Sequence, residues 1–279
     1  MSIIYINPYR FVTYDLWTPA EMSTILWLDA NDTSTVLRDN PGVDDQVYQW
    51  NDKSGNNNHA TQSNDALKPT WNSAGYVQFT GNIAGGDIMQ VTNDPFRDLQ
   101  NPAIIAVAKY YDPNGQTWSN ALATYDGEGL GWQLRQFSTD VSKLELTIIG
   151  TAGEATFFNN PPTSITTLSD FIIAGYRKNS DTRLMRGNGT QTGIKSGNDT
   201  GTIPYGAATN RSGIGGRFRS DNWGSIQGNL DGHIREIIVA DGLSDSNIEK
   251  IEGYLAYKWG LSGNLPAGHP YKSEPPYVQ

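Results

Sequence analysis

The stretch over residues 50–62, WNDKSGNNNHATQ, gathers side chains that could bind a ligand or a metal ion. Asp52 and Lys53 stand close to a run of Asn, and His59 is one of the three histidines in the chain. Asn and Gly also favour tight turns, because both tolerate left-handed backbone and the Asn side chain bonds nearby main chain. We therefore expect a turn here, held together by Asp52 and the Asn side chains, rather than a ligand site.

A metal centre needs several ligands close together, and the histidines do not supply them. None has a second ligand at metal-binding spacing, and they lie far apart in the sequence: His59, His233 and His269. Calcium takes loop carboxylates, but the chain has no calcium loop of the D-x-D-x-D-G type. We expect the acids that could contribute to cap turns instead: Asp29, Asp32 and Asp52. With no phosphate-binding loop either, the sequence predicts no metal and no cofactor.

The common patterns of hydrolytic enzymes are missing from the sequence. There is no G-x-S-x-G motif and no cysteine. Glycoside hydrolysis needs two carboxylates about 5–10 Å apart, which one strand can supply as E-x-D-x-E or E-x-D-x-x-E. Neither pattern occurs, and Glu145, Glu236 and Asp241 each stand alone. We predict no catalytic residues, and a glycoside hydrolase with an unrecognised acid pair is kept as an alternative.

Three loops combine aromatic and polar side chains, at 114–120, 123–129 and 217–225. Sugar rings stack their apolar faces on aromatic rings, and their hydroxyls bond to carboxylate, amide and guanidinium groups. The densest of the three loops is RFRSDNWGS at 217–225. The predicted ligand-binding residues are Trp223, Asp221, Asn222, Arg217, Arg219, Trp118 and Tyr125. The alternative for Trp223 is that its ring folds back and anchors the loop.

Charge and hydropathy exclude several kinds of partner. The chain has 279 residues and a net charge of −9, so a nucleic-acid backbone would be repelled. No apolar run approaches the ~18 residues of a transmembrane helix, so we expect no membrane partner. The first residues lack the basic start and apolar run of a secretory signal, which favours synthesis in the cytoplasm.

Short strand-like runs separated by turn residues dominate the chain. The run 143–149, KLELTII, alternates apolar and polar residues, as a half-buried strand does. The run 104–110, IIAVAKY, is nearly all apolar, which predicts a strand covered on both faces. Asn188-Gly189 fits the type I′ turn of a hairpin. These features predict an all-β fold built as an antiparallel sandwich or barrel.

Two helical segments and three regions complete the predicted organisation. Thr18 begins a capping box that should start a short helical turn. The segment 243–261 predicts a helix capped by Ser244 or Ser246, with an apolar face that packs on the sandwich. We expect an N-terminal attachment arm at 1–18, one sandwich domain with its C-terminal helix at 19–263, and an extended Pro-rich tail at 264–279.

Both ends of the domain resemble a known family. LWLDANDTSTV at 26–36, QWNDKSGNNNHATQ at 49–62 and the closing stretch at 228–272 are similar to laminin-G-like domains of the concanavalin A-like lectin/glucanase superfamily. The resemblance implies a two-sheet antiparallel jelly-roll sandwich with the C-terminal helix packed on it. It also implies carbohydrate binding, by analogy of fold.

The opening residues resemble those of phage virion proteins, in which such a domain follows directly without a signal. The leading interpretation is a non-enzymatic virion structural protein: a capsid decoration, a fibre or a tail receptor-binding protein. It would join other virion proteins through its arm, act as a homo-oligomer or in many copies, and bind cell-surface glycans weakly but with avidity. A free-standing bacterial lectin or adhesin domain is the alternative.

Replacing Trp223 by Ala is expected to weaken the binding of glycans or host cells several-fold, because one such aromatic contact contributes roughly 0.5–2 kcal/mol. The melting temperature should hardly change. Binding isotherms and thermal melts of the two proteins check this. If melting falls sharply while each folded molecule binds as before, Trp223 is a packing residue.

Overall fold

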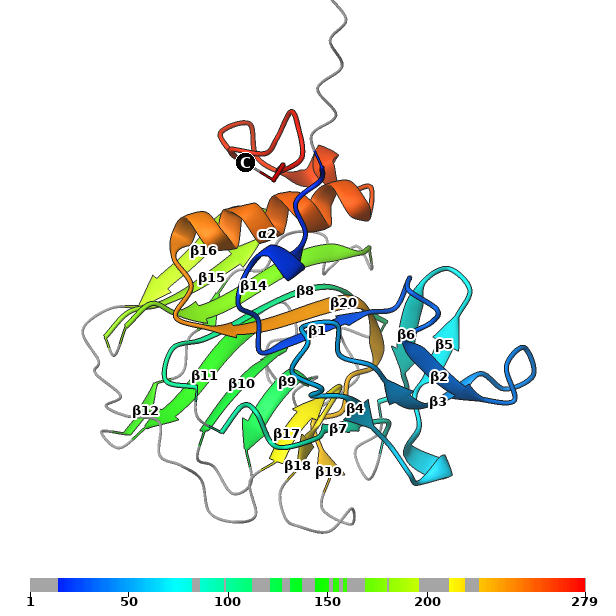
Figure 1. Ribbon diagram of the computed structural model, residues 1–279. Coiled ribbons are helices and arrows are strands. Elements are labelled where there is room, and N and C mark those ends of the chain that lie inside the picture. Colours follow the sequence, from blue (N-terminus) through cyan, green and yellow to red (C-terminus); the bar gives the residue numbers. More distant parts are fainter. Residues whose placement is uncertain are drawn as a thin grey trace, which may run out of the picture.

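The computed structural model describes residues 15–81, 86–97, 99–111, 121–126, 131–136, 144–150, 153–155, 158–159, 169–179, 181–195, 211–218 and 226–278. Strands are the main regular elements of this part of the chain, and every pairing between the described strands is antiparallel (Figure 1). They form two layers, and the one described α-helix, α2 (Asp245–Lys258), lies on the outer side of the first layer.

The first layer is centred on two long strands, β8 (Pro102–Tyr110) and β20 (Gly232–Asp241), which pair with each other. Beyond β8 follow β14 (Phe171–Arg177), β15 (Arg183–Gly187) and β16 (Thr190–Lys195). The other edge of β20 pairs with both β1 (Leu26–Asp29) and β6 (Tyr76–Phe79). As predicted, β15 and β16 form a hairpin through Asn188 and Gly189, whose φ angles are 48° and 77°.

The second layer runs in the order β4 (Ala60–Thr61), β7 (Met89–Val91), β17 (Arg211–Ile214), β9 (Ala121–Asp126), β10 (Gly131–Gln136) and β11 (Leu144–Gly150). The short strands β12 (Gly153–Ala155) and β13 (Phe158–Asn159) pair with β11. A small separate hairpin joins β18 (Arg217–Phe218) to β19 (Ile226–Gln227).

One edge connects the two layers. There β3 (Gln46–Trp50) pairs with β2 (Val36–Asp39), with β4 of the second layer and with β5 (Thr70–Asn72). Strand β5 in turn pairs with β6 of the first layer. Apart from β18 and β19, the described strands therefore form one continuous hydrogen-bonded network that folds over itself at β3. The predicted two-sheet antiparallel jelly-roll sandwich with a C-terminal helix is confirmed.

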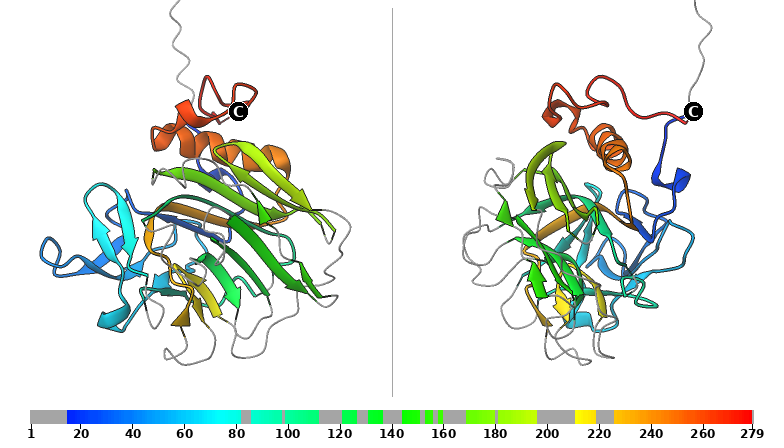
Figure 2. Two further views of the ribbon diagram at one scale, coloured as in Figure 1. Left: turned by 180° about the vertical axis from the view of Figure 1, so that it is seen from behind. Right: turned by 90° about the vertical axis from the view of Figure 1, so that its left-hand side faces the viewer.

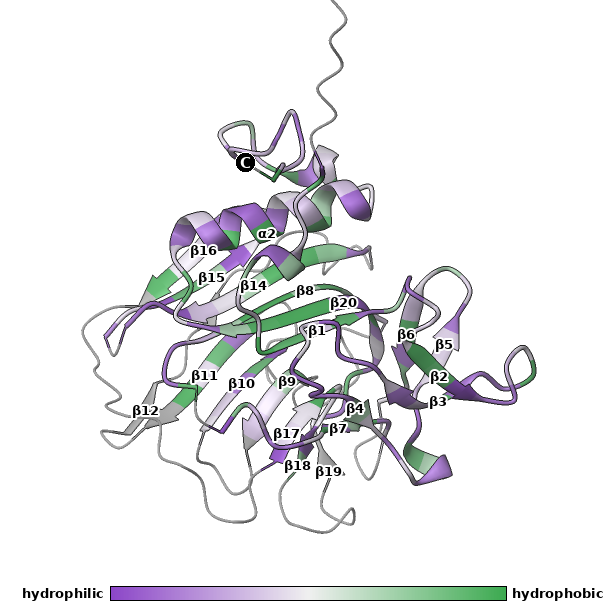
Figure 3. Cartoon of the chain, viewed as in Figure 1, coloured by the Kyte–Doolittle hydropathy of each residue, from purple (hydrophilic) through white to green (hydrophobic). Residues whose placement is uncertain are grey.

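The core between the layers consists of side chains that alternate along the strands. On β11, Leu144, Leu146 and Ile148 point into it, as the sequence predicted, and are at most 2% exposed. Residues of β8 alternate between this core and a second one, because Ile104 faces the sandwich and Ile105 faces the helix. Figure 3 shows that β8 and β20, which lie between α2 and the second layer, are largely hydrophobic. The prediction that 104–110 is covered on both faces is confirmed.

Helix α2 closes the second core. Its Ile248, Ile251 and Leu255 are fully buried against β8 and β14, on the side of the first layer that faces away from the second (Figure 2). Ser244 is the N-cap, and its hydroxyl accepts a hydrogen bond from the amide of Asn247 at 3.2 Å. The cap satisfies one of the amides that a helix start leaves unpaired.

Both termini of the described chain pack beside α2. Trp17 is 4% exposed and meets Tyr254 edge-on at 6.1 Å between ring centroids. The Trp17 amide donates to the carbonyl of Pro276 at 3.0 Å, and the Val278 amide donates to that of Asp15 at 2.9 Å. A 3-10 turn, η1 (Pro19–Glu21), follows the Thr18 cap, as predicted. Residues 1–14 of the predicted arm lie outside the described residues.

The stretch over residues 50–62 is a turn, and Asp52 organises it. One oxygen of the Asp52 carboxylate accepts from the amides of Trp27 and Ser54, both at 2.9 Å. The other accepts from the Ser54 hydroxyl at 2.7 Å and the Asn58 amide at 3.0 Å. The side chains of Asn56 and Asn58 donate to carbonyls of the chain before β1. The predicted turn is confirmed.

Replacing Asp52 by Ala should lower the free energy of unfolding by about 2–4 kcal/mol, because several partly buried donors lose their acceptor at once. Asp52→Asn should cost less, since one carbonyl oxygen remains. The control is Asp44→Ala in an exposed loop, which should change stability by less than about 0.5 kcal/mol. Chemical denaturation measures all three, and an Asp52→Ala protein as stable as the control would contradict the assignment.

Candidate functional site

Five of the seven predicted ligand-binding residues lie outside the described residues: Trp118, Arg219, Asp221, Asn222 and Trp223. Arg217 opens the short strand β18 and is half-buried. The ligand site predicted at 217–225 therefore stays a prediction, because most of its residues lie outside the described part of the chain.

The prediction for Tyr125 needs correction. Its ring is 1% exposed and belongs to the core between the layers, where β9 lies next to Trp132 of β10. The cause is strand alternation: Ala123 and Tyr125 face inwards together, which the loop-like composition of 123–129 concealed. A ring without an exposed face cannot stack on a sugar.

Each of the acids considered for catalysis already has a partner, and two of the three, Glu145 and Glu236, are buried. Glu145 is fully buried on the outer face of β11, where Oε1 contacts the Arg135 guanidinium and accepts from the Thr147 hydroxyl at 2.5 Å. Its alternation predicted a polar face, but not this degree of burial. Asp241 is exposed and accepts from the amide of Asn101 at 2.6 Å.

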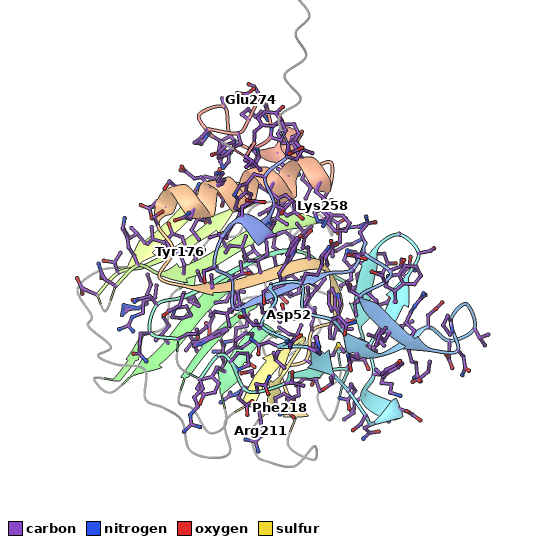
Figure 4. The ribbon with its side chains drawn as sticks, in the orientation of Figure 1. Asp52, Tyr176, Arg211, Phe218, Lys258 and Glu274 are labelled. Carbon is purple, nitrogen blue, oxygen red and sulfur yellow. The ribbon has the colours of Figure 1, made fainter. Side chains whose placement is uncertain are left out.

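Glu236 is fully buried beneath the end of α2. It accepts hydrogen bonds from the indoles of Trp27 at 2.7 Å and Trp259 at 2.8 Å, and from the hydroxyl of Tyr254 at 2.9 Å. Lys258, labelled in Figure 4, lies 2.7 Å from both Glu236 and Asp29. Burial raises the pKa of Glu236, although the Lys258 ammonium opposes the shift. This cluster joins helix to sheet and leaves no exposed acid.

A third polar cluster surrounds His233 at the start of β20. Asp170 lies 2.5 Å from Nε2, the Tyr111 hydroxyl lies 2.8 Å from Nδ1, and Tyr76 stacks on the ring at 4.1 Å. Burial lowers the pKa of His233 more than Asp170 raises it, and burial raises the pKa of the Tyr111 phenol. A neutral imidazole therefore bridges a protonated phenol and a carboxylate. His233 is buried, so the cluster offers packing rather than an open reactive group.

A polar groove lies at the edge where the two layers join. It has a volume of about 320 Å³ and is lined by Asp39, Tyr48, Gln49, Thr61, Gln62, Ser63 and Lys68. These residues come from the ends of β2 and β4, from the middle of β3 and from the chain around η2 (Asp65–Leu67). Along β3, Val47 and Trp50 point into the core while Tyr48 points outward, with 39% of the residue exposed.

Hydrogen bonds fix the groove before any ligand binds. Gln62 is buried, donating from Nε2 to the carbonyl of Ile88 at 2.7 Å and accepting at Oε1 from the amide of Asn64 at 2.8 Å. Gln49 donates from Nε2 to the side-chain oxygen of Asn51 at 2.7 Å. The amide planes on the wall are therefore held in place, which reduces the entropy lost on binding.

Lys68 is the cation of the groove, and two carboxylates hold it. Its ammonium forms ion pairs with Asp39 and with Asp65, the latter at 2.6 Å. The hydrogen bond with Asp39 raises the pKa of Lys68, and the bond with Asp65 adds to this effect. The side chain is only 7% exposed, whereas that of Asp65 is 81% exposed.

Sequence reasoning missed this groove because it searched loops for aromatic residues with charges of both signs close in sequence. Tyr48 belongs to a strand, and the charges that surround it come from positions 39 and 68. VYQW does not reveal the groove, because strict alternation would place Tyr48 on the same face as Trp50. Tyr48 points the other way because it lies in a β-bulge, where Val47 pairs with Arg38 and Gln49 pairs with the preceding residue of β2. What the sequence alone could not supply was the pairing that brings β2, β3 and β4 together.

A second groove, of about 420 Å³, lies between α2 and the two terminal segments. It is mainly apolar, with lining residues Leu16, Trp17, Thr18, Tyr254, Tyr257, Lys258, Pro275 and Pro276. Among the described residues no group of three or more His, Cys, Asp or Glu side chains could hold a metal ion. No described helix is long and apolar enough to cross a bilayer.

Comparison with protein-family models and with curated proteins finds no match to the sequence. The binding domain of botulinum neurotoxin serotype D aligns with 82% of this chain and 50% of that chain, at 14% identity and a TM-score of 0.52. The binding domain of Paraclostridial Mosquitocidal Protein 1 aligns with 85% of this chain and 53% of its own, at 13% identity and a TM-score of 0.53.

The CBM40 of the Ruminococcus gnavus IT-sialidase, solved with alpha2,3 sialyllactose, aligns with 61% of this chain and 94% of that chain, at 15% identity and a TM-score of 0.48. The fold likeness rests on the first two domains, whose TM-scores exceed 0.5. This chain spans about half the length of each of them. It is similar to them in its β-sandwich fold.

Proposed function

We propose that this chain is a non-catalytic glycan-binding β-sandwich and that the groove beside Tyr48 is its ligand site. The observation that carries the proposal is an exposed aromatic ring set among fixed polar side chains in a preformed groove. The apolar face of a sugar ring can stack on Tyr48, while its hydroxyls bond to groups such as Asp39 and Gln49. The volume is within the usual range of small-ligand sites.

The fold likeness is compatible with this role. Two of the structures that share the fold are binding domains, and another is the receptor binding domain of botulinum neurotoxin D. A fold can host unrelated functions, so the proposal depends on the groove and not on this likeness.

The absence of catalysis is part of the proposal. Glu145 and Glu236 are fully buried, and each carboxylate already contacts a cation. An acid pair for glycoside hydrolysis must be open to substrate and water. A panel of polysaccharides should therefore yield no reducing sugar; release that is lost in Glu145→Gln or Glu236→Gln would favour the hydrolase alternative.

We further propose that the domain is displayed in many copies on a virion, as the resemblance of the opening residues to phage virion proteins implies. Weak single sites then give useful avidity. The described end of the arm supports an attachment role, because Leu16 is 60% exposed beside the apolar groove. A free-standing bacterial lectin is the alternative, and mass spectrometry of purified virions distinguishes the two.

Tyr48→Ala should weaken the binding of a responsive glycan about 2- to 12-fold, since one aromatic stacking contact is worth about 0.5–1.5 kcal/mol. Tyr48→Phe is the matched control: it keeps the ring and should retain most of the affinity. Neither change should destabilise the domain by more than about 1 kcal/mol, because the side chain is partly exposed. Isothermal calorimetry and thermal melts measure both effects.

The same titration with Trp223→Ala compares the two proposed sites directly. Loss of binding in Trp223→Ala with full binding in Tyr48→Ala would move the ligand site to the 217–225 loop. Loss in neither variant would contradict both assignments.

Deleting residues 2–14 should leave a folded monomer that no longer assembles. The deletion keeps Asp15 and Trp17, whose hydrogen bonds to the tail hold the described terminus in place. Light scattering after gel filtration reports the oligomer, and circular dichroism reports the fold. Global unfolding, or an unchanged oligomer, would contradict the attachment arm.

A further inference from the structure

We infer that the groove beside Tyr48 selects uncharged glycans and rejects anionic ones such as sialylated, sulfated or uronic-acid sugars. This inference rests on the proposed function, because it names the ligand class of the same groove. Its basis is the charge balance of three side chains: one cation, Lys68, is held between the carboxylates of Asp39 and Asp65.

Lys68 is not available as a counter-ion for an anionic sugar. Its ammonium already forms ion pairs with both carboxylates, and the side chain is 7% exposed. An incoming anion would have to compete with Asp39 and Asp65 for the same ammonium. The three groups together carry a net charge of about −1 near neutral pH, so the groove itself repels a negative ligand.

The uncommitted polar groups lead to the same conclusion. Among the described residues, Asp39 Oδ1 and Gln49 Oε1 have no recorded hydrogen-bond donor, whereas Gln49 Nε2 is already bonded to Asn51. Both free atoms are acceptors. Sugar hydroxyls can donate to them, but a carboxylate or sulfate has no hydrogen to donate and would place oxygen against oxygen.

Stacking on Tyr48 does not distinguish charged from neutral sugars, so the discrimination must come from this electrostatic balance. Asp65 is the residue to change. Its carboxylate is 81% exposed, so an amide at this position removes one negative charge at little structural cost. Asp44→Asn is the matched control, since it changes the net charge equally and Asp44 is an exposed loop residue outside the lining of the groove.

The experiment uses the full chain and matched glycan pairs: lactose with 3′-sialyllactose, and neutral gluco-, manno- and N-acetylglucosamine oligomers with their sulfated or uronic-acid forms. Binding is measured at about 20 mM and 300 mM salt. For the pairs that bind, the affinity for the neutral member should exceed that for the anionic member by about tenfold or more at low salt. The gap should narrow at high salt, because exposed charges are screened.

At low salt, Asp65→Asn should reduce the ratio of neutral to anionic glycan affinity several-fold. Asp44→Asn should leave this ratio unchanged. Equal or tighter binding of the anionic member, or an equal effect of the two variants, overturns the selectivity. If the selectivity is overturned but Tyr48→Ala still abolishes binding, the groove remains the glycan site and only the charge selectivity is wrong. Failure of every glycan to bind overturns both the proposed function and this inference.

Discussion

The arrangement of the molecule depends on a middle layer that must be buried on both faces. Strands β8, β14 and β20 carry apolar side chains on each side. Exposing either face would leave a large apolar surface in water, which would cost about 25 cal/mol of folding free energy for each Å². The second layer covers one face and α2 the other, so neither the sandwich nor the helix is complete alone.

Two buried charge clusters fix the helix on that layer. Near its C-terminal end, Glu236 binds Trp27, Tyr254, Trp259 and Lys258. In the middle of α2, the carboxylate of Glu252 is paired with the guanidinium of Arg186 in β15 at 2.9 Å. Buried ion pairs add little net stability, but removing one partner leaves an uncompensated charge. We therefore interpret both clusters as determinants of the helix position rather than as chemistry.

The sequence predicts more of the fold than of the candidate site. Alternation in KLELTII, the apolar run at 104–110, the Asn188-Gly189 turn and the capped helix are local patterns that report local structure. Burial of Tyr125 and Glu145 depends on which strands become neighbours, which is a long-range property. The groove has the same dependence, because Asp39, Tyr48 and Lys68 meet only through the pairing at β3. The loop with Trp223 was chosen by closeness in sequence, which is a weaker guide than closeness across a sheet.

The groove joins these observations to a function: β3, which connects the two layers, also presents Tyr48 outward among fixed polar groups. The most direct measurement is an amide chemical-shift titration of the ¹⁵N-labelled chain with the neutral oligosaccharide that binds best. The account predicts shifts centred on residues 39, 48–49, 61–63 and 68. Shifts centred on 217–225 or on the outer face of β9–β11, with the groove unaffected, would contradict it.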